Sequence, residues 1–397
     1  MYQQVQYSRS QKNGSPSMNF IALKMLTGDR AKYLGLIFTI AFASFLLANQ
    51  ISIFAGIMKR TASPVLDVVD ADIWVMDPAT QYIDEIKPLK DTDLYRIRGV
   101  SGVDWAVRLF KGLPRAVARD GRFRQVVLIG VDDATLVGVP HGKMRVGSVL
   151  DLRQPNAIIM DYAGYRYFFP EGPITLPQEF EFNDRRVTLV GVSDASAPFA
   201  TFPVVHARYS DAVAFQGRER NQLSFVLVKA AAGVDPLALA AQIEEQTGLL
   251  AQTRAEFIWQ NIAYYLKNTG IPINFGITIS IATLVGVVVM GQTFYIFTLE
   301  NLKQFGALKA IGVGNFTLMG MILLQALVVG GIGYSLGMGI CASFFQITQQ
   351  NLPTRGLILL PEAMVGVAIT VLVIVVVASL LSIRKVLVLE PAVVFRG

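Results

Sequence analysis

The stretch INFGITISIATLVGVVVMGQTFYIF (Ile273–Phe297) decides the fold class, because it contains no charged residue from end to end. A helix of about 20 apolar residues is long enough to cross the hydrocarbon core of a membrane. Three more such stretches occur at Tyr33–Ile57, Phe316–Phe345 and Ala363–Ile383. Only 16% of the residues are charged, whereas soluble domains have roughly a quarter. The sequence therefore predicts an α-helical membrane protein with four transmembrane helices.

Many of the positive charges lie at the ends of these apolar stretches. They gather in the N-terminal flank, in the link after the second span and in the C-terminal tail, at Arg9, Lys12, Lys24, Arg30, Lys32, Lys303, Lys309, Arg384, Lys385 and Arg396. The link between the last two spans has only Arg355. Because cytoplasmic links carry the excess of basic residues, both termini are predicted to be cytoplasmic, in a multi-pass protein of the inner (plasma) membrane. The net charge of +6 then needs no nucleic acid as a partner.

The first apolar stretch is longer than the hydrophobic part of a signal peptide, so we expect an uncleaved anchor. The predicted segments follow in chain order: cytoplasmic amphipathic segment 1–32, transmembrane helix 33–57, extracytoplasmic domain 58–270, transmembrane helix 271–297, cytoplasmic segment 298–314, transmembrane helix 315–346, short outer loop 347–361, transmembrane helix 362–385 and cytoplasmic tail 386–397.

The large segment 58–270 alternates strand and helix patterns, which is typical of a mixed α/β domain. Strands are predicted at Ala71–Met76, Gln125–Val131, Arg186–Val192 and Leu223–Lys229, and helices at Asp91–Arg98 and Pro236–Thr247. Gly248 directly follows the second helix and acts as a stop signal. Strand–helix–strand recurs near both ends, so we expect a small α/β unit made from both ends, with a β-rich subdomain inserted into it.

Small residues predict where the membrane helices pack, because lipid itself does not drive helices together. The third span contains Gly333-xxx-Gly337, and the second contains Ala282-xxx-Gly286. None of the four spans has a charged residue at its centre, and Gln325 is among the few strongly polar side chains there. Ion pumps and proton relays usually need intramembrane carboxylates or histidines. The sequence therefore argues against an ion-coupled carrier.

Catalytic and metal-binding motifs are missing from the sequence. It has no GxSxG elbow, no HExxH motif and no P-loop, and one cysteine and two histidines give no metal-ligand spacing. The adjacent pair Asp132-Asp133 is compatible with a cation site, but a solvated turn is the simpler interpretation. The basic stretch from Arg108 to Arg124 is compatible with contact to anionic headgroups or a partner, or with a solvated hairpin.

The stretch LENLKQFGALKAIGVG (Leu299–Gly314) suggests a function. Its residues Leu299, Leu302, Phe305 and Leu308 recur every three positions, which gives a helix one apolar face. We expect a short amphipathic helix at the cytoplasmic interface, continuous with the second span. A plain connector lying on headgroups is the alternative.

The run Glu300–Gly314 resembles the "E…K…G.LKAIG" signature of the FtsX/MacB/LolC permease superfamily of ABC transporters. The similarity extends over the whole chain, from the basic amphipathic segment Phe20–Lys32 to the tail Glu390-Pro391-Ala392. Within the superfamily the chain looks most like the DevC-type permeases. The resemblance implies that residues 58–270 form a MacB-like periplasmic core with a porter-like unit and an inserted subdomain.

The resemblance also implies the roles of residues and partners. The cytoplasmic segment would dock on a separate ATPase, with the contact made or shaped by Glu300, Lys303, Gly306, Leu308, Lys309 and Gly312. ATP and Mg would be bound by that partner, so this chain would hold no cofactor and would not be an enzyme by itself. Further implied partners are a second copy of the permease, a membrane-fusion protein, an outer-membrane channel and membrane lipid. Export of a substrate is the expected activity; FtsX-like signalling to an extracellular enzyme and LolC-like lipoprotein or lipid extraction are the alternatives.

Overall fold

A computed structural model describes residues 18–217, 223–351 and 359–388 of the chain. The chain divides into two compact units, which we describe separately. Within the described residues, the helix bundle consists of residues 18–52, 275–344 and 359–388, and the α/β domain consists of residues 53–217, 223–274 and 345–351. The expected basic residues Arg9 and Lys12, the loop residue Arg355 and the tail motif 390–392 lie outside the described residues.

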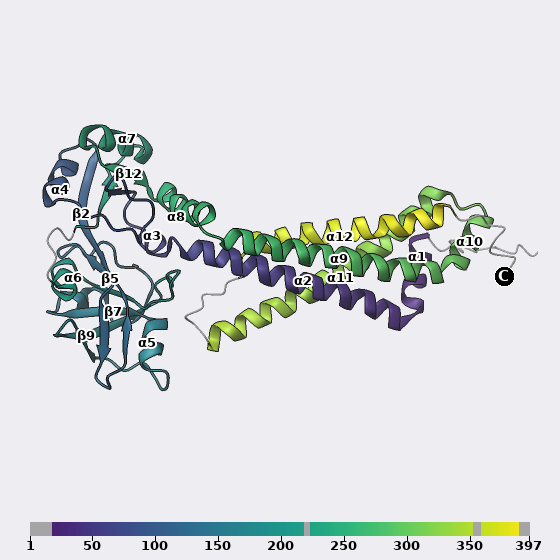
Figure 1. Cartoon of the computed structure of the whole chain (residues 1–397), viewed down its shortest axis with the longest axis horizontal. Coiled ribbons are helices and arrows are strands. Elements are labelled where there is room, and N and C mark those ends of the chain that lie inside the picture. Colours follow the sequence, from purple (N-terminus) through teal and green to yellow (C-terminus); the bar gives the residue numbers. More distant parts are fainter. Residues whose placement is uncertain (1–17, 218–222, 352–358, 389–397) are drawn as a thin grey trace, which may run out of the picture. The chain divides into compact units, whose positions relative to one another are not determined.

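Four helices of the described chain are long and apolar enough to span a membrane, which confirms the predicted fold class. They are α2 (Arg30–Arg60), α9 (Ile271–Glu300), α11 (Asn315–Asn351) and α12 (Pro361–Leu387). Each helix extends beyond its predicted apolar stretch, and α11 continues into the segment that we expected to be an outer loop. Two short helices, α1 (Met18–Gly28) and α10 (Leu302–Ala310), accompany them in Figure 1.

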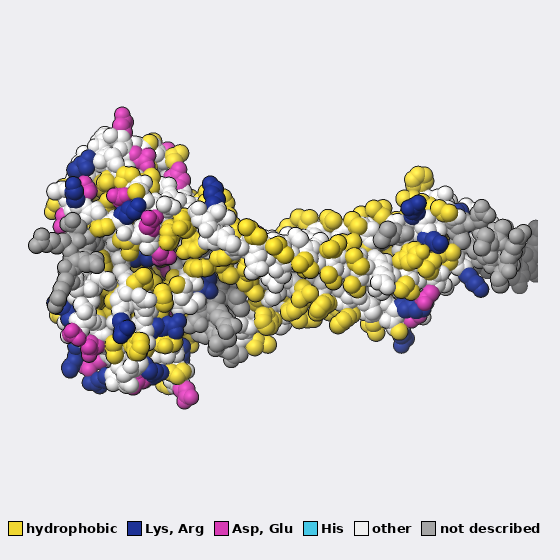
Figure 2. Space-filling view, viewed as in Figure 1, with side chains coloured by type: hydrophobic (Ala, Val, Ile, Leu, Met, Phe, Trp, Pro, Cys, Tyr) yellow, Lys and Arg dark blue, Asp and Glu magenta, His cyan; other side chains and the backbone are white. Residues whose placement is uncertain are grey.

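The surface of the bundle suits lipid. Figure 2 shows hydrophobic side chains along its length, while charged side chains gather at the end that carries α1 and α10. Helix α9 exposes a row of large apolar residues that includes Ile277, Ile281, Leu284 and Val288. In a soluble protein such a row would be costly, whereas a bilayer accepts it.

Glycines allow the helices of the bundle to approach closely. A Cβ built at Gly333 would lie 2.6 Å from Cβ of Ile40, and one built at Gly337 would lie 2.7 Å from Cβ of Ser44. Helix α11 therefore packs on α2 at the Gly333-xxx-Gly337 face. Gly286 of α9 is buried, and a Cβ there would lie 3.2 Å from Cδ1 of Ile374 in α12, whereas Ala282 is half-buried.

Twelve strands of the described α/β domain form one mixed sheet, in the order β12-β1-β11-β2-β5-β10-β7-β9-β8-β3-β4, with β6 paired to β9. Most neighbours are antiparallel, but β5–β10 and β7–β9 are parallel. The strands are β1 (Ile73–Met76), β2 (Val103–Gly112), β3 (Arg115–Ala118), β4 (Phe123–Gln125), β5 (Val127–Val131), β6 (Met144–Val146), β7 (Ala157–Asp161), β8 (Gln178–Phe182), β9 (Arg185–Ser193), β10 (Val204–Arg208), β11 (Phe225–Ala230) and β12 (Leu250–Thr253).

The expected unit made from both ends of the domain is present. Strands β1, β11, β12 and the first part of β2 pair together, and α4 (Asp91–Arg98) packs on β2 and on α7 (Pro236–Thr247). Both helices have their predicted bounds. The carboxylate of Asp235 caps α7 by accepting from the backbone N–H of Leu237 and Ala238, and Gly248 ends it at φ +68°.

The inserted subdomain begins at the second part of β2, where residues Phe110–Gly112 pair with β5. It contains two helices that we did not predict, α5 (Tyr162–Phe168) and α6 (Tyr209–Gln216), and a 3-10 helix at Val149–Arg153. The predicted strand Gln125–Val131 is wrong as one element, because it contains the end of β4 and the whole of β5. Val126 separates them and donates its backbone N–H to the carbonyl of Pro114.

Candidate functional site

The predicted coupling helix is α10, and it is a separate helix rather than a continuation of α9. Asn301 interrupts the two, and its side-chain amide donates to the carbonyl of Phe297 at 2.8 Å. Figure 1 shows that the chain changes direction there. The backbone angles of Asn301, φ −88° and ψ 7°, lie outside the helical range, so the prediction of one continuous helix was wrong at Asn301.

One face of α10 is buried and the opposite face is open. Phe305 and Gly306 are buried, Leu308 is half-buried, and Lys303 and Gln304 are exposed. Gly312 ends the segment with φ +96°, a conformation that favours glycine. Just beyond α10, Ile311 and Phe316 are 77% and 89% exposed, so the open face includes apolar as well as basic side chains.

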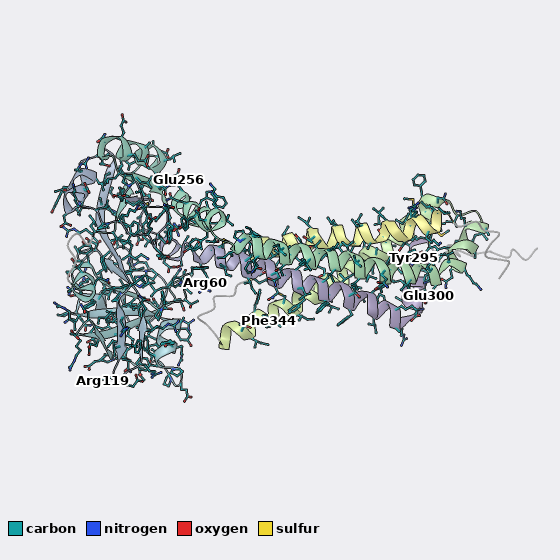
Figure 3. All side chains as sticks on the ribbon, in the orientation of Figure 1. Arg60, Arg119, Glu256, Tyr295, Glu300 and Phe344 are labelled. Atoms are coloured by element: carbon teal, nitrogen blue, oxygen red, sulfur yellow. The ribbon has the colours of Figure 1, made fainter. Side chains whose placement is uncertain are left out.

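Contacts to other helices of the bundle lie on both sides of α10. Just before it Glu300, the last residue of α9 and marked in Figure 3, forms an ion pair with Lys32 at the start of α2. At the far end of α10 the ammonium of Lys309 donates to the carbonyl of Leu387 in the last turn of α12, at 2.9 Å. The predicted residues therefore separate into two groups. Glu300 ties the end of α9 to α2 and Lys309 ties α10 to α12, whereas Lys303 faces outward.

Helix α1 is part of the same site, and the sequence did not reveal how it is held. The buried side chain of Gln325 in α11 donates to the carbonyl of Ala22 at 2.8 Å, and Ala22 and Leu26 are fully buried. Lys32 also pairs with Asp29, at the junction of α1 and α2, at 2.8 Å. The coupling end of the bundle thus includes α1, α10 and the ends of three long helices.

A second set of contacts lies at the base of the α/β domain, where α2 ends. Arg60, the last residue of α2, donates to the carbonyl of Pro198 at 2.8 Å. Asp67 closes the short helix α3 (Ser63–Asp67), and its carboxylate accepts from the backbone N–H of Ser196 at 2.6 Å and from Lys143 at 2.7 Å. The end of α2 is therefore fastened to the inserted subdomain.

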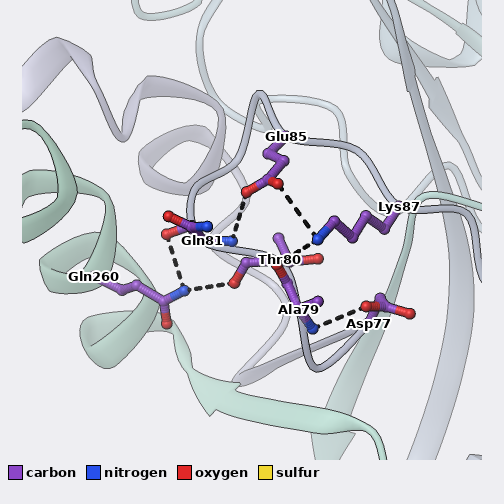
Figure 4. A network of polar contacts seen from close by, with 7 residues as sticks. All are labelled: Asp77, Ala79, Thr80, Gln81, Glu85, Lys87 and Gln260. Atoms are coloured by element: carbon purple, nitrogen blue, oxygen red, sulfur yellow. Dashed lines mark hydrogen bonds and ion pairs between the residues drawn. The ribbon is translucent and has the colours of Figure 1, made fainter. Parts of the chain in front are cut away.

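Helix α8 (Arg254–Asn268), which precedes α9, is fastened to the same domain. Its first residue, Arg254, donates to the carbonyls of Val65 and Leu66 in α3. Further along, Gln260 donates to the carbonyls of Thr80 and Gln81 at 3.0 Å each, and Figure 4 shows how these bonds hold the loop after β1. Helix α3, which follows α2, and helix α8, which precedes α9, are therefore hydrogen-bonded to each other.

Comparisons with known proteins identify the family. A family model described as the MacB-like periplasmic core domain matches residues 34–246, and one described as the FtsX-like permease C-terminal domain matches residues 276–391. The chain belongs to the FtsX/MacB-like permeases. Such permeases are membrane components of ABC transporters and are not catalytic by themselves. The resemblance inferred from the sequence is confirmed at this level, and the DevC-type subgroup stays a prediction.

Solved structures of extracytoplasmic regions of transporters are similar to about half of this permease. The periplasmic region of MacB from Actinobacillus actinomycetemcomitans has 13% identity and a TM-score of 0.37, and the alignment covers 52% of this chain and 96% of that chain. The extracellular domain of the ABC-type transporter YknZ from Gram-positive bacteria has 14% identity and a TM-score of 0.34, with coverages of 46% and 98%. None of the curated proteins compared with the permease matches it.

The acidic pair Asp132-Asp133 and the basic stretch from Arg108 to Arg124 make hydrogen bonds and ion pairs within the α/β domain of the permease. Asp132 accepts from the backbone and hydroxyl of Thr135, and Asp133 accepts from Ser210. In the basic stretch, Lys111 is buried against Asp84, and Arg119 pairs with Glu179. The described residues hold no cluster of three or more histidine, cysteine, aspartate or glutamate side chains that fits a metal ion.

Two buried titratable groups of the permease lie on the neighbouring strands β7 and β10. Burial raises the pKa of Asp161 to about 7, although its carboxylate accepts from the backbone N–H of Gly164 and of Val204. Burial lowers the pKa of His206 to about 4, so its imidazole is neutral at pH 7. Both groups are enclosed in the domain, so they bear on stability rather than on catalysis.

Proposed function

We propose that this permease couples ATP hydrolysis by a separate ABC-type ATPase to movement of its α/β domain. The observation that carries the proposal is the arrangement of α10. Its exposed face presents Lys303 and Gln304, Lys309 holds its far end to α12, and Glu300, which directly precedes it, joins the end of α9 to α2. A docked partner that moves α10 would therefore move those helices as well.

In the proposed mechanism α2 and α9 act as levers. Helix α2 carries movement from Lys32 to Arg60, and the contacts of Arg60, Asp67 and Arg254 pass it to the α/β domain. The central parts of the spans have no charged residue, which favours a lever over a hydrophilic pore. Nucleotide and Mg would stay on the partner ATPase.

We propose export as the activity, with the α/β domain facing away from the cytoplasm and both termini facing the ATPase. The two-part outer domain favours export with a membrane-fusion protein, as in DevC-type permeases, and a second copy of the permease would complete the complex. An outer-membrane channel would continue the route. Signalling to an extracellular enzyme and extraction of a lipoprotein remain the alternatives within the same mechanical scheme.

The proposal is tested by purifying the tagged full-length chain from its native membrane in mild detergent. We expect an ATPase with a P-loop to co-purify and to hydrolyse ATP in a vanadate-sensitive manner. Lys303→Glu should weaken its retention, because the substitution reverses a charge on the exposed face of α10. Lys267→Glu, a charge reversal in the last turn of α8 and outside α10, is the matched control.

Recovery of the chain without any ATPase would overturn the proposal. Retention of the ATPase to the same extent in Lys303→Glu and in the control would place the docking face elsewhere. Co-purification of a membrane-fusion protein would favour export, and co-purification of a cell-wall hydrolase would favour signalling.

A further inference from the structure

Two adjoining hollows lie at the coupling end of the helix bundle, and Lys32 lines both of them. The first has a volume of about 560 Å³ and lies between α1, the start of α2 and the junction of α9 with α10. The second has a volume of about 350 Å³ and lies between α2 and α9, further into the spans. Both volumes are within the range of roughly 300–1,000 Å³ that small-molecule sites occupy.

The second hollow is mostly apolar. Its lining includes Leu36, Val289, Ile296 and Phe297, with the polar side chains of Gln292 and Thr293. A Cβ built at Gly35 would meet nothing within 4 Å, so glycine leaves this space open. An apolar hollow that lies between membrane helices suits an acyl chain.

The first hollow carries balanced charge. Two ammonium groups, Lys24 and Lys32, and two carboxylates, Asp29 and Glu300, line it. Lys32 is shared between both carboxylates, and Lys24 is exposed, with its ammonium 5.8 Å from the centre of the Phe20 ring. The hollow therefore offers positive and negative groups side by side at the end of the apolar space.

We propose that the two hollows together bind one zwitterionic glycerophospholipid with a primary ammonium, such as phosphatidylethanolamine. Its phosphate would meet the Lys24 ammonium and its own ammonium would meet Glu300, while an acyl chain runs past Gly35. An anionic headgroup would face two carboxylates with no ammonium to offer them, so charge complementarity favours the zwitterion.

The bound lipid would sit between α2 and α9, at the point where the Lys32–Glu300 pair joins them. It would therefore make the transfer of movement depend on the lipid. This consequence rests on the proposed function, whereas the binding of the lipid does not.

The test measures which lipids the full-length chain retains when no ATPase is present. The chain is placed in nanodiscs with equal amounts of phosphatidylethanolamine and phosphatidylglycerol, extracted in mild detergent and analysed by native mass spectrometry. Gly35→Leu fills the apolar hollow. Gly276→Leu is the matched control, because Gly276 of α9 also has no atom within 4 Å of a built Cβ and lies outside both hollows.

We expect one phosphatidylethanolamine per chain for the wild type and for Gly276→Leu, and about tenfold less for Gly35→Leu. Glu300→Gln should shift retention toward phosphatidylglycerol, because the headgroup ammonium loses its carboxylate. Equal retention in Gly35→Leu and wild type would overturn the proposal, as would wild-type retention of phosphatidylglycerol in place of phosphatidylethanolamine.

Discussion

Replacing Asp67 with asparagine should loosen the attachment of α2 and α3 to the inserted subdomain. The carboxylate is 4% exposed and accepts from Lys143 at 2.7 Å, from the Ser196 N–H at 2.6 Å and from the Ser196 hydroxyl at 2.6 Å. Asparagine keeps the shape but loses the charge, and its amide nitrogen replaces one acceptor with a donor.

The size of the effect follows from these contacts. Breaking a buried ion pair by removing one partner costs about 3–5 kcal/mol, and hydrogen bonds to a charged group contribute about 1.5–3 kcal/mol. Because the Lys143 side chain is 39% exposed, solvent screens its share, so we expect a loss of about 3 kcal/mol. Each 1.4 kcal/mol corresponds to a factor of ten, so local opening should become about 100-fold more frequent.

Hydrogen exchange of the Ser196 amide measures this opening, because its N–H donates directly to Asp67. In Asp67→Asn the protection of Ser196 should fall by about 100-fold while the strands of the sheet keep theirs. Asp70→Asn is the control, because the Asp70 side chain is 37% exposed and pairs with His141 at 3.4 Å. Unchanged protection at Ser196, or equal loss throughout the sheet, would refute the reasoning.

Three further predictions concern packing, coupling and pH. Gly337→Leu should destabilise the bundle by about 1–3 kcal/mol, because the added side chain overpacks against Ser44, and the melting temperature in detergent should fall. Gly339→Leu is the control and should leave the melting temperature unchanged, because a Cβ built at Gly339 has no atom within 4 Å. Lys309→Met should leave the ATPase active but remove the effect of the permease on the rate of ATP hydrolysis, because α10 loses its hydrogen bond to α12. If the permease still changed that rate as the wild type does, the bond would have no role in coupling. In Asp161→Asn, the free energy of unfolding of the domain should fall by up to about 3 kcal/mol as pH falls from 6.5 to 4. The reason is that the folded state keeps His206 neutral, whereas the unfolded state protonates it. In His206→Phe, the free energy of unfolding should instead fall as pH rises from about 4 to about 7, because the unfolded state ionises Asp161 while the folded state keeps the buried carboxyl protonated. Denaturant unfolding across pH checks both slopes.

Local patterns in the sequence were enough to find the spans and several elements of the α/β domain. Charge-free stretches bounded by lysine, arginine or glutamate marked all four long helices. Pro236 and Gly248 fixed both ends of α7, because a helix start and stop depend on residues next to it in sequence. The signature around Gly306 led to the family.

Contacts between residues that are distant in sequence were not predictable in this way. Gln325 holds α1 across 303 positions, and Asp67 reaches Ser196 across 129. Each depends on a tertiary hydrogen bond that leaves no periodic pattern. The break at Asn301 was missed because the apolar repeat continues across it, and the backbone angles of one residue leave no trace in that repeat.

The short helices α5 and α6 were missed for a related reason. Each has only seven or eight residues and follows directly on a buried strand, so helical periodicity has too little length to appear. Asp161 caps α5 and is itself the last residue of β7. One residue thus ends a strand and begins a helix.

Exchange at Ser196 in the assembled complex tests most directly whether force enters at α10 and reaches the α/β domain. The permease and its ATPase are reconstituted in nanodiscs, and the exchange rate is compared without nucleotide and after trapping with ATP and vanadate. The rate should change on trapping in the wild type and stay constant in Lys309→Met. An exchange rate at Ser196 that does not change on trapping in the wild type, or that changes equally in Lys309→Met, would contradict the account.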